Sequence, residues 1–349
     1  MSIVIITGSN GLVGSETANF FSSKGFDVVG IDNNLRKFFF GNEGSTSKIK
    51  HHLLKNNKRF KNHNIDIRNY FALEKIYKVY KKNISLIIHC AAQPSHDYGK
   101  KFPILDFNVN ATGTLNLLEL TKKYCPETPF IFMSTNKVYG DNPNRLKLIE
   151  NKTRWELNKK NKYFKGIDEK FSIDNCTHSF FGVSKTYADL IVQEYGKNVG
   201  LKTVCFRAGC LTGPNHSGAK LHGFLSYLVK ISLSKKKYSL IGYKGKQVRD
   251  NLHSFDLVNS FWEFFKKPTK GEVYNIGGGR YSNCSIIEAL SLVENIANIS
   301  VKREVLKIPR VGDHIWYISN LSKFKRHYPN WKQKYNTKKI IEDLIASEK

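Results

Sequence analysis

The sequence predicts an α/β fold in which helices cover both faces of a doubly wound parallel sheet, followed by a smaller C-terminal α/β domain. Short apolar strands alternate with helical segments through the first half of the 349 residues, which is typical of parallel βαβ units. A glycine-rich turn directly follows the first of these strands. The strands are almost wholly apolar, as expected when both faces of a sheet are covered.

Strands and helices are expected in alternation along the first domain, which we place at residues 1–207. The expected strands lie at residues 3–7, 27–32, 86–91, 130–134 and 203–207, and the expected helices at 14–24, 70–82, 103–124 and 179–200. Two polar stretches rich in lysine and asparagine, 37–64 and 142–177, interrupt the pattern and are expected to be surface insertions near a site.

The pattern changes after residue 207, and this change predicts a second domain at residues 208–349. A turn rich in glycine and proline at 211–215 precedes an expected helix at 221–233. A strand and turn near 242–246, a helix near 255–265 and a strand near 273–276 follow. The segment near 250–276 is expected to pack back on the first domain.

The glycine-rich turn contains Gly8, Gly11 and Gly14, placed between the first strand and the first helix. These glycines permit a tight turn, a close approach of the backbone to a pyrophosphate, and close packing of helix on strand. The N-terminus of the helix favours the negative charge of the phosphates. Asp32 ends the second strand 18 positions after Gly14 (32 minus 14), where a carboxylate accepts hydrogen bonds from a ribose diol. The turn and Asp32 together predict a Rossmann-type NAD site, although Arg36 could instead reach the 2′-phosphate of NADP.

A second motif, Phe181-Gly-Val-Ser-Lys185, lies in an expected helix. Many NAD(P)-dependent enzymes place a tyrosine four residues before a lysine, so that both side chains project from one helix face. The phenol, its pKa lowered by the lysine charge, then exchanges a proton with a sugar hydroxyl. Phe181 occupies the tyrosine position here and has no hydroxyl, so the proton must take another route.

Composition limits the class of protein. A hydrophobic fraction of 40% and an aromatic fraction of 13% indicate a folded protein. No stretch approaches the roughly 20 apolar residues of a membrane span, and no secretion signal is visible at the N-terminus. The six cysteines include no C-x-x-C pair, which indicates reduced thiols rather than disulfides or zinc ligands. We therefore expect a cytoplasmic protein with no membrane partner and no metal.

The net charge of +27 arises from 56 Lys and Arg against 29 Asp and Glu. The lysines are spread along the chain without regularly interleaved aromatic residues, and no nucleic-acid module has a signature here. We therefore expect no nucleic-acid partner. A positive field would still help to collect an anionic nucleotide substrate.

Four further strings resemble the extended short-chain dehydrogenase/reductase superfamily of the NAD-dependent epimerase/dehydratase type. They are Asp66-Ile-Arg68, His89-Cys-Ala-Ala-Gln93, Asn110-Ala-Thr-Gly-Thr114 and Ser134-Thr-Asn-Lys-Val-Tyr-Gly140. Within the superfamily, the last string together with Gly245-Lys-Gln-Val-Arg-Asp250 and Asn275-Ile-Gly-Gly278 is most similar to the CDP-paratose (CDP-tyvelose) 2-epimerases. The resemblance runs from residue 3 to about residue 331, nearly the whole chain.

The resemblance implies a role for individual positions. Its cofactor site comprises Gly8, Asn10, Gly11, Leu12, Gly14, Asp32, Asn33, Arg36, Asp66, Ile67, Ala91, Ala92, Gln93, Asn110, Ser134 and Lys185. Thr135 occupies the position that hydrogen-bonds the reacting hydroxyl in the family. Lys185 occupies the position that binds the nicotinamide ribose. The implied substrate residues are Gln93, His96, Asn136, Lys137, His222, Lys246 and Arg249, of which Arg249 would grip the substrate diphosphate with its bidentate fork.

The proton route has several alternatives. His178 is a possible substitute base, because an imidazole titrates near neutrality and a residue three positions before Phe181 can share its helix face. Ser179, His96 and Tyr98 also lie close to the motif or follow the strand at 86–91. A third route would use Thr135 and a relayed water. Finally, the chain could bind its ligands without catalysis.

The resemblance implies C2 epimerisation of a CDP-linked deoxyhexose through a transient keto intermediate. The alternatives are 4-epimerisation, dehydration or decarboxylation of a nucleotide sugar, or a non-catalytic relative that binds NAD and a nucleotide sugar, or RNA. Relatives commonly dimerise through two helices, which correspond to residues 103–124 and 179–200, so a homodimer is expected.

Overall fold

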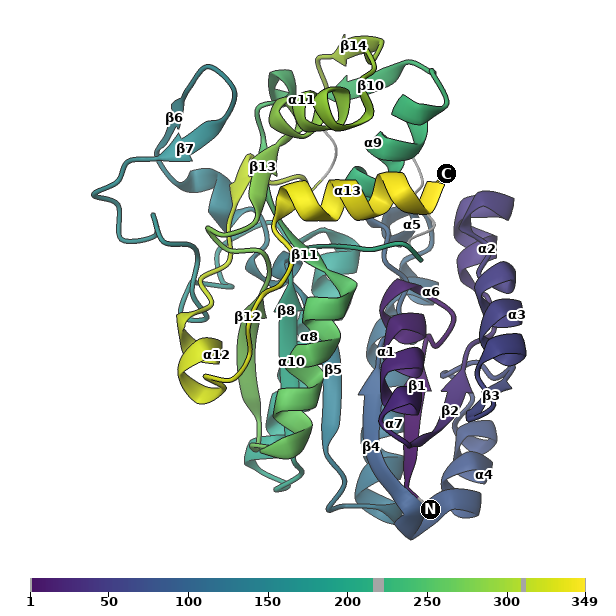
Figure 1. The fold of residues 1–349 in the computed structure, drawn as a ribbon. Helices are drawn as coiled ribbons and strands as arrows, with labels where there is room; N and C mark the ends of the chain where they lie inside the picture. The colour runs from purple at the N-terminus through teal and green to yellow at the C-terminus, as the bar shows by residue number, and fades with distance from the viewer. Residues whose placement is uncertain (1, 216–222, 309–311, 349) are drawn as a thin grey trace. The chain divides into compact units, whose positions relative to one another are not determined.

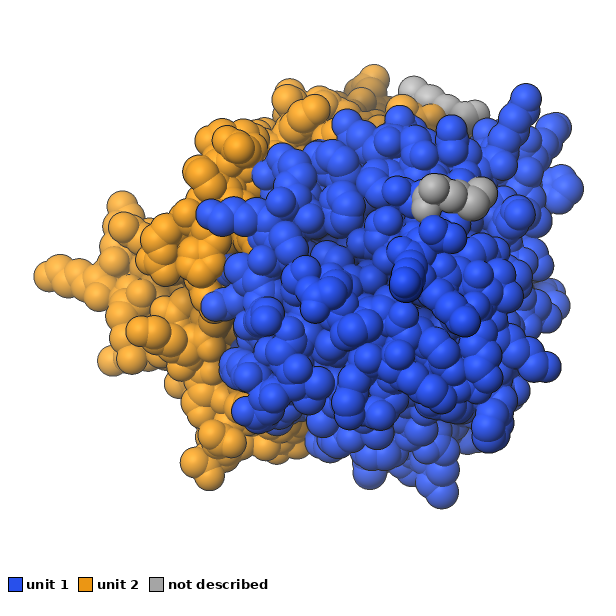
Figure 2. Space-filling view, turned by 90° about the horizontal axis from the view of Figure 1, so that it is seen from below, with its two compact units in different colours: residues 1–138, 180–207, 258–274 blue, residues 139–179, 208–257, 275–349 orange. Residues whose placement is uncertain are grey.

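The computed structural model describes residues 2–215, 223–308 and 312–348. It divides into two compact units, coloured separately in Figure 2. The first unit comprises residues 1–138, 180–207 and 258–274, and the second comprises residues 139–179, 208–257 and 275–349. This division differs from a single boundary at residue 207, because residues 139–179 cluster with the second unit and residues 258–274 with the first.

A seven-stranded sheet with the order β12-β8-β5-β4-β1-β2-β3 forms the centre of the first unit (Figure 1). Its strands are β1 (Ile3–Thr7), β2 (Asp27–Ile31), β3 (Phe60–His63), β4 (Ile84–His89), β5 (Phe130–Thr135), β8 (Thr203–Ala208) and β12 (Glu272–Ile276). The pairs from β3 to β5 are all parallel. The strand order reverses between β1 and β4, and ligands of such sheets bind outside the carboxyl ends of the strands at this reversal.

The helices associated with this sheet are α1 (Leu12–Ser23), α2 (Arg36–Phe40), α3 (Ser47–Asn56), α4 (Tyr70–Tyr80), α5 (His96–Lys101), α6 (Pro103–Phe107), α7 (Gly113–Tyr124), α8 (Ser179–Lys197) and α10 (Ser254–Lys266). A π-helical turn at Asn108–Thr112 joins α6 to α7, so the helix predicted at 103–124 contains one wider turn. The predicted insertion at 37–64 contains α3 and the edge strand β3. The sequence pattern missed β3 because, after Phe60, its residues are polar, as edge strands often are.

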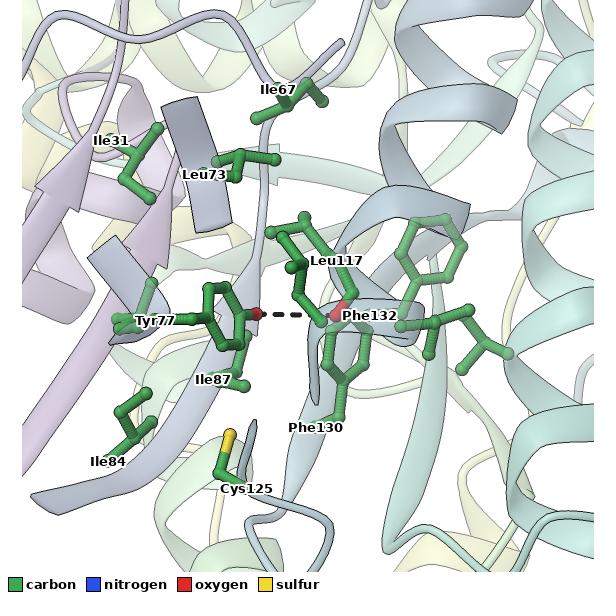
Figure 3. Close-up of a cluster of buried hydrophobic side chains, with 14 of the residues drawn as sticks. Ile31, Ile67, Leu73, Tyr77, Ile84, Ile87, Leu117, Cys125, Phe130 and Phe132 are labelled. Carbon is green, nitrogen blue, oxygen red and sulfur yellow. Dashed lines mark hydrogen bonds between the residues drawn. The ribbon is translucent and has the colours of Figure 1, made fainter. Parts of the chain in front are cut away.

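One hydrophobic cluster joins the sheet to α4, α7 and α8 (Figure 3). Ile87 of β4 and Phe130 of β5 are fully buried in it. The ring of Tyr77 is also fully buried, and its hydroxyl donates to the carbonyl oxygen of Leu117 at 3.4 Å. Burial of side chains of this size contributes about 1.5–3 kcal/mol each. The phenol oxygen is thus satisfied inside an otherwise apolar layer.

Aromatic side chains pack α1 against α10. Trp262 of α10 meets Phe20 and Phe21 of α1 edge-on, at centroid distances of 6.0 and 5.9 Å. Phe265 adds a contact to Phe26 at 5.5 Å. These contacts explain why residues 258–274, although distant in sequence, cluster with the first unit.

The second unit has a four-stranded sheet of β9 (Cys210–Thr212), β11 (Val248–His253), β13 (Asn283–Ser285) and β15 (Trp316–Tyr317). Two smaller sheets pair β10 (Tyr238–Ile241) with β14 (Arg303–Leu306), and β6 (Leu148–Glu150) with β7 (Trp155–Leu157). Its helices are α9 (Phe224–Leu233), α11 (Ile286–Ala297), α12 (Ser322–His327) and α13 (Thr337–Glu348). Buried residues of α9, α11 and α13 form its core with β10.

An ionic network fastens the β6–β7 hairpin within the second unit. Arg154 donates to both carboxylate oxygens of Glu288, at 2.8 and 2.5 Å. Glu156 accepts two bonds from Arg280, at 2.8 and 3.1 Å, and one from the indole nitrogen of Trp316 at 2.8 Å. The stretch predicted as a surface insertion at 142–177 is therefore held by bidentate, partly buried ion pairs.

Candidate active site

The turn between β1 and α1 has glycines because its backbone touches other backbone. Gly8 has a φ of +67°, and a Cβ there would lie 2.7 Å from the backbone nitrogen of Ala91. A Cβ at Gly14 would lie 2.1 Å from the carbonyl oxygen of Gly8. Only glycine fits at these two positions, and the contact brings the turn against the segment that follows β4.

Gly11 is not enclosed by backbone in this way. A Cβ at this position would meet only the carbonyl oxygen of Gly8 within 4 Å, at 3.4 Å. Gly11 is the N-cap of α1, which begins at Leu12 without a side-chain cap, so the first helical N–H groups have no side-chain acceptor there. This geometry fits a pyrophosphate placed against the turn.

Asp32 follows β2 and is fixed by two backbone groups. The N–H groups of Asn10 and Asn34 donate to its two carboxylate oxygens at 3.0 and 2.8 Å. Burial raises the pKa of Asp32, and these two bonds oppose that shift. Each oxygen keeps a lone pair for a ribose hydroxyl. The side chain of Asn10 donates instead to Asn62 of β3 at 3.0 Å, so Asn10 holds the turn in place.

Arg36 begins α2, and its guanidinium carbon lies 4.6 Å from the centroid of the Phe40 ring. Burial lowers the pKa of Arg36 to about 10. Asp66 is bound by Arg68, at 2.9 and 2.6 Å, and by the amide of Asn33 at 3.0 Å. Burial raises the pKa of Asp66, but the bonds with Arg68 outweigh it, so the carboxyl group stays ionised. Next to it, Ile67 is buried.

A buried histidine links the ends of β1 and β4. Thr114 donates its hydroxyl proton to the carbonyl oxygen of Asn110 at 2.6 Å, so it accepts from Nε2 of His89 at 2.9 Å. Nδ1 of His89 then accepts from the hydroxyl of Thr7 at 2.7 Å. Burial holds the pKa of His89 well below its usual value, which keeps the imidazole neutral. The backbone nitrogen of Ala91 donates to the same Thr7 hydroxyl at 3.2 Å, which fixes the segment of Ala91 and Ala92.

A second buried network joins the segment after β4 to α8. Asn110 accepts from the backbone nitrogen of Gln93 at 2.9 Å and donates to Ser184 of α8 at 3.0 Å. Asp106 accepts from Ser184 and from the amide of Gln93, both at 2.5 Å. Burial raises the pKa of Asp106. The amide of Gln93, predicted at the substrate, is fully buried and bonded to Ser95 and Asp106.

Lys185 is a buried cation on α8. Its Nζ donates to the carbonyl oxygen of Met133 at 2.7 Å and lies 4.1 Å from the centroid of the Phe132 ring. Burial lowers the pKa of Lys185 to about 8. Both partners belong to β5, so Lys185 is held beside the carboxyl end of that strand, where Thr135 lies.

The residues at the end of β5 are oriented by their neighbours. Ser134 donates to the carboxylate of Asp189, which lies one turn after Lys185 on α8. The hydroxyl of Thr135 accepts from the backbone nitrogen of Lys137 at 3.2 Å. Asn136 is buried and Lys137 is partly exposed. Thr135 therefore lies two residues after Met133, whose carbonyl oxygen accepts from Lys185.

Phe181 is buried, and its ring meets the imidazole of His96 edge-to-face, at 5.1 Å and 75°. His178 does not share its helix face, because α8 begins at Ser179, whose φ is +63°. In the second unit, both ring nitrogens of His178 lie 3.7 Å from Sγ of Cys176. The helical-spacing argument for His178 is therefore wrong, while its role as a base stays a prediction.

A family model described as the NAD dependent epimerase/dehydratase family matches residues 4–277. The chain belongs to this family. A curated relative, the CDP-paratose 2-epimerase of Salmonella typhi, is 31% identical over 98% of this chain and 97% of its own length. The UDP-glucuronate 4-epimerase of Thermodesulfobacterium geofontis is 26% identical over 95% of this chain and 91% of its own length.

A solved structure, UDP-glucuronic acid 4-epimerase from Bacillus cereus, superposes with a TM-score of 0.79 over 99% of this chain and 98% of that one, at 23% identity. This likeness confirms the predicted Rossmann-type fold. Membership of the epimerase/dehydratase family confirms the resemblance seen in the sequence and the prediction of NAD as cofactor.

The implied substrate residues of the second unit are held in ion pairs. Arg249 of β11 donates to Asp313 at 2.5 Å, and Lys246 donates to Glu150 at 2.8 Å. His222 lies outside the described residues. Over residues 2–215, 223–308 and 312–348, no group of His, Cys, Asp or Glu is placed to hold a metal, and no helix is long and apolar enough to cross a bilayer.

Sequence reasoning missed the buried residues that support this site: Thr7, His89, Asp106, Thr114, Ser184 and Asp189. One signal was available for Asp189, because it lies four residues after Lys185 and so shares its helix face. For Asp106 the sequence offers only a carboxylate inside an apolar helical run. This pattern is equally consistent with an exposed carboxylate on the helix surface.

Proposed function

We propose that this family member is an NAD-dependent nucleotide-sugar epimerase that acts at C2 of a CDP-linked deoxyhexose through a transient keto intermediate. The observation that carries the proposal is its 31% identity to a CDP-paratose 2-epimerase over 98% of the chain. Other relatives are named for reactions on UDP and dTDP sugars, so the nucleotide and the carbon atom are the parts that need a test.

The chain's own residues would bind and orient both ligands. The turn at Gly8–Gly14 fits the pyrophosphate, and the carboxylate of Asp32 fits the adenosine ribose. Bound NAD would supply the acceptor and donor of hydride for the reacting carbon. Lys185 would bond the nicotinamide ribose, Thr135 the reacting hydroxyl, and Arg249 the substrate diphosphate.

The test is incubation with a panel of CDP-, UDP- and dTDP-linked sugars, followed by NMR of the recovered sugar. We expect inversion at C2 of a CDP-linked deoxyhexose, with deuterium at C2 retained in the product. Inversion at C4, or turnover of a UDP sugar alone, would replace the proposal with another reaction of the family. Phe181 favours one further candidate, a non-catalytic relative, which would bind a nucleotide sugar without converting it.

We also propose a homodimer formed through the helical segments at 103–124 and 179–200, which include α6 and α8. Phe180, Val183 and Leu190 of α8 are 53%, 55% and 43% exposed and recur at helical spacing. Phe107 of α6 adjoins this face through the ring of Tyr187, at a centroid distance of 5.7 Å. Apolar side chains gathered on a surface mark an interaction site.

Val183→Glu places a charge in this face and is expected to convert a dimer into a folded monomer. The measurement is light scattering coupled to size exclusion, with Val199→Glu as the matched control, because Val199 is 44% exposed and lies beyond the end of α8. A wild-type protein that elutes as a monomer at micromolar concentration would contradict the dimer.

A further inference from the structure

The imidazole of His96 lies against the side chain that replaces the phenol. We propose that His96 is the catalytic acid and base of this enzyme, taking the proton of the reacting sugar hydroxyl in place of the missing tyrosine. The inference rests on the proposed epimerase function and names the residue that function lacks.

The position of His96 in the fold places it at the ligand crevice. His96 begins α5 in the segment that follows β4, and β4 lies between β1 and β5 in the sheet. The carboxyl ends of these strands carry the glycine turn and Thr135, and doubly wound sheets bind their ligands at these ends. His96 is therefore a titratable side chain on the same edge of the sheet as the cofactor turn.

The imidazole of His96 contacts the ring of Phe181, which belongs to the Phe181–Lys185 motif on α8. Phe181 lies one helical turn before Lys185, so the two side chains occupy one face of α8. The rings of His96 and Phe181 have centroids 5.1 Å apart and planes at 75°, so the edge of one meets the face of the other. Of the two histidines considered from the sequence, His96 is the one that the structure brings to Phe181.

Contacts on one side of α5 fix this arrangement. Ser95 caps α5 by accepting from the backbone nitrogen of Tyr98 at 3.3 Å, and its own nitrogen donates to Gln93 at 2.5 Å. A Cβ at Gly99 would lie 3.0 Å from the backbone nitrogen of Phe181. The helix that carries His96 therefore runs in direct backbone contact with the start of α8.

Aromatic packing fixes the other side of α5. The ring of Tyr98 meets Phe39 and Phe40 of α2 at centroid distances of 5.4 and 5.7 Å. It also stacks on Phe102 at 6.3 Å, with the planes 7° apart. The helix α5 therefore contacts two elements of the candidate site. One is α2, which follows Asp32 in the chain, and the other is α8, which carries Lys185. A base needs this kind of fixed geometry to act efficiently.

The proposed step balances with NAD as the redox partner. His96 would take the hydroxyl proton on an imidazole nitrogen as the carbon–oxygen double bond forms, while bound NAD would supply the acceptor for the hydrogen and the electron pair that leave the carbon. In the reverse direction the imidazolium would return the proton to oxygen, with the hydride supplied to the other face of the carbon. An imidazole nitrogen can accept this proton and return it, whereas a phenol needs a neighbouring cation to do so.

The first experiment measures turnover of the most active sugar of the panel by His96→Ala, His178→Ala and His52→Ala. We expect His96→Ala to lower kcat by about 100- to 10,000-fold with NAD affinity within about twofold of wild type. His52→Ala, at an exposed histidine of α3, is the control and is expected to keep kcat within about twofold. Retained turnover in His96→Ala, or its loss in His178→Ala alone, overturns the assignment.

The second experiment separates catalysis from packing. Phe181→Tyr in the His96→Ala background restores a phenol four residues before Lys185, and we expect it to recover at least about tenfold in kcat. A merely structural role for His96 would give no recovery, and that result overturns the proposal even if His96→Ala is inactive. Phe181→Tyr alone serves as the folding control.

The outcomes also separate this inference from the proposed function. Turnover of a sugar other than a CDP-linked one, with loss and rescue at His96, contradicts only the substrate assignment. Turnover of the CDP sugar that is insensitive to His96→Ala contradicts only the role of His96. A wild-type protein that converts no sugar of the panel overturns both.

Discussion

Arg207→Met is expected to lower the free energy of unfolding by about 3–5 kcal/mol, because it leaves a carboxylate buried without its cation. Arg207 donates to Asp189 from Nε at 3.1 Å and from Nη2 at 2.7 Å. The side chain of Arg207 is 6% exposed and that of Asp189 is fully buried. The measurement is urea unfolding at pH 7, with the slope checked for a change in the denatured state.

The control variant also removes the unpaired charge of the Asp189 carboxylate. Arg207→Met combined with Asp189→Asn keeps an oxygen for Ser134 and is expected to recover at least half of the loss, because neutral replacement of both partners avoids the unpaired buried ion. A single variant that loses under 1 kcal/mol would mean that water or Lys185 compensates Asp189. Equal losses in the single and double variants would assign the effect to packing of Arg207 instead.

The Arg207–Asp189 pair also connects stability to the site. Asp189 lies one turn after Lys185 on α8, accepts from Ser134 at the end of β5, and binds Arg207 of β8. One buried carboxylate thus fixes the helix that carries Lys185 relative to two neighbouring strands. Disturbing the pair is expected to lower turnover as well as stability, since Thr135 directly follows Ser134.

The glycine turn and the position of Asp32 were predictable because their requirements are local. Gly8 and Gly14 are needed where backbone meets backbone, and Asp32 directly follows β2, so spacing along the chain identifies all three positions. The parallel sheet was equally visible, because β4 and β5 are continuous apolar runs.

The supporting networks were not predictable, because their partners are distant in sequence. His89 bonds Thr7, 82 positions away, and Thr114, 25 positions away, and neither distance follows from periodicity. The candidate for the catalytic base could not be chosen from the sequence for the same reason. Helical spacing favoured His178, but Ser179 has a positive φ, so His178 does not continue the helix. Tertiary packing instead brings His96 to Phe181.

Lys185→Met is expected to stabilise the fold while removing activity. The pKa of Lys185 falls from 10.5 to about 8 because burial disfavours its charge. A shift of this size corresponds to a cost of roughly 3 kcal/mol for burying the charge, and the variant gives back part of that amount because it loses the hydrogen bond to Met133. We therefore expect a net gain of about 1–2 kcal/mol at pH 7 in urea unfolding, since methionine fills a similar length without a charge.

The pH dependence of this gain follows from the direction of the shift. Below about pH 8 the amine is protonated in both states, so the full cost of burying the charge is present in the wild type. Between about 8 and 10.5 the unfolded wild type binds more protons than the folded protein, so its stability rises with pH. The advantage of Lys185→Met over the wild type should therefore be largest at pH 7 and shrink toward pH 10.

Activity supplies the other half of the test. Lys185→Met is expected to lower turnover by at least about 1,000-fold, because the cation held by β5, which is the proposed donor to the nicotinamide ribose, is lost. Lys197→Met is a matched control, since Lys197 ends the same helix and bonds Gln193 at 3.0 Å. A variant that is less stable at pH 7 would show that Lys185 contributes to the fold. Greater stability with lost turnover would show that the chain keeps a buried cation for the reaction, at a cost to its stability.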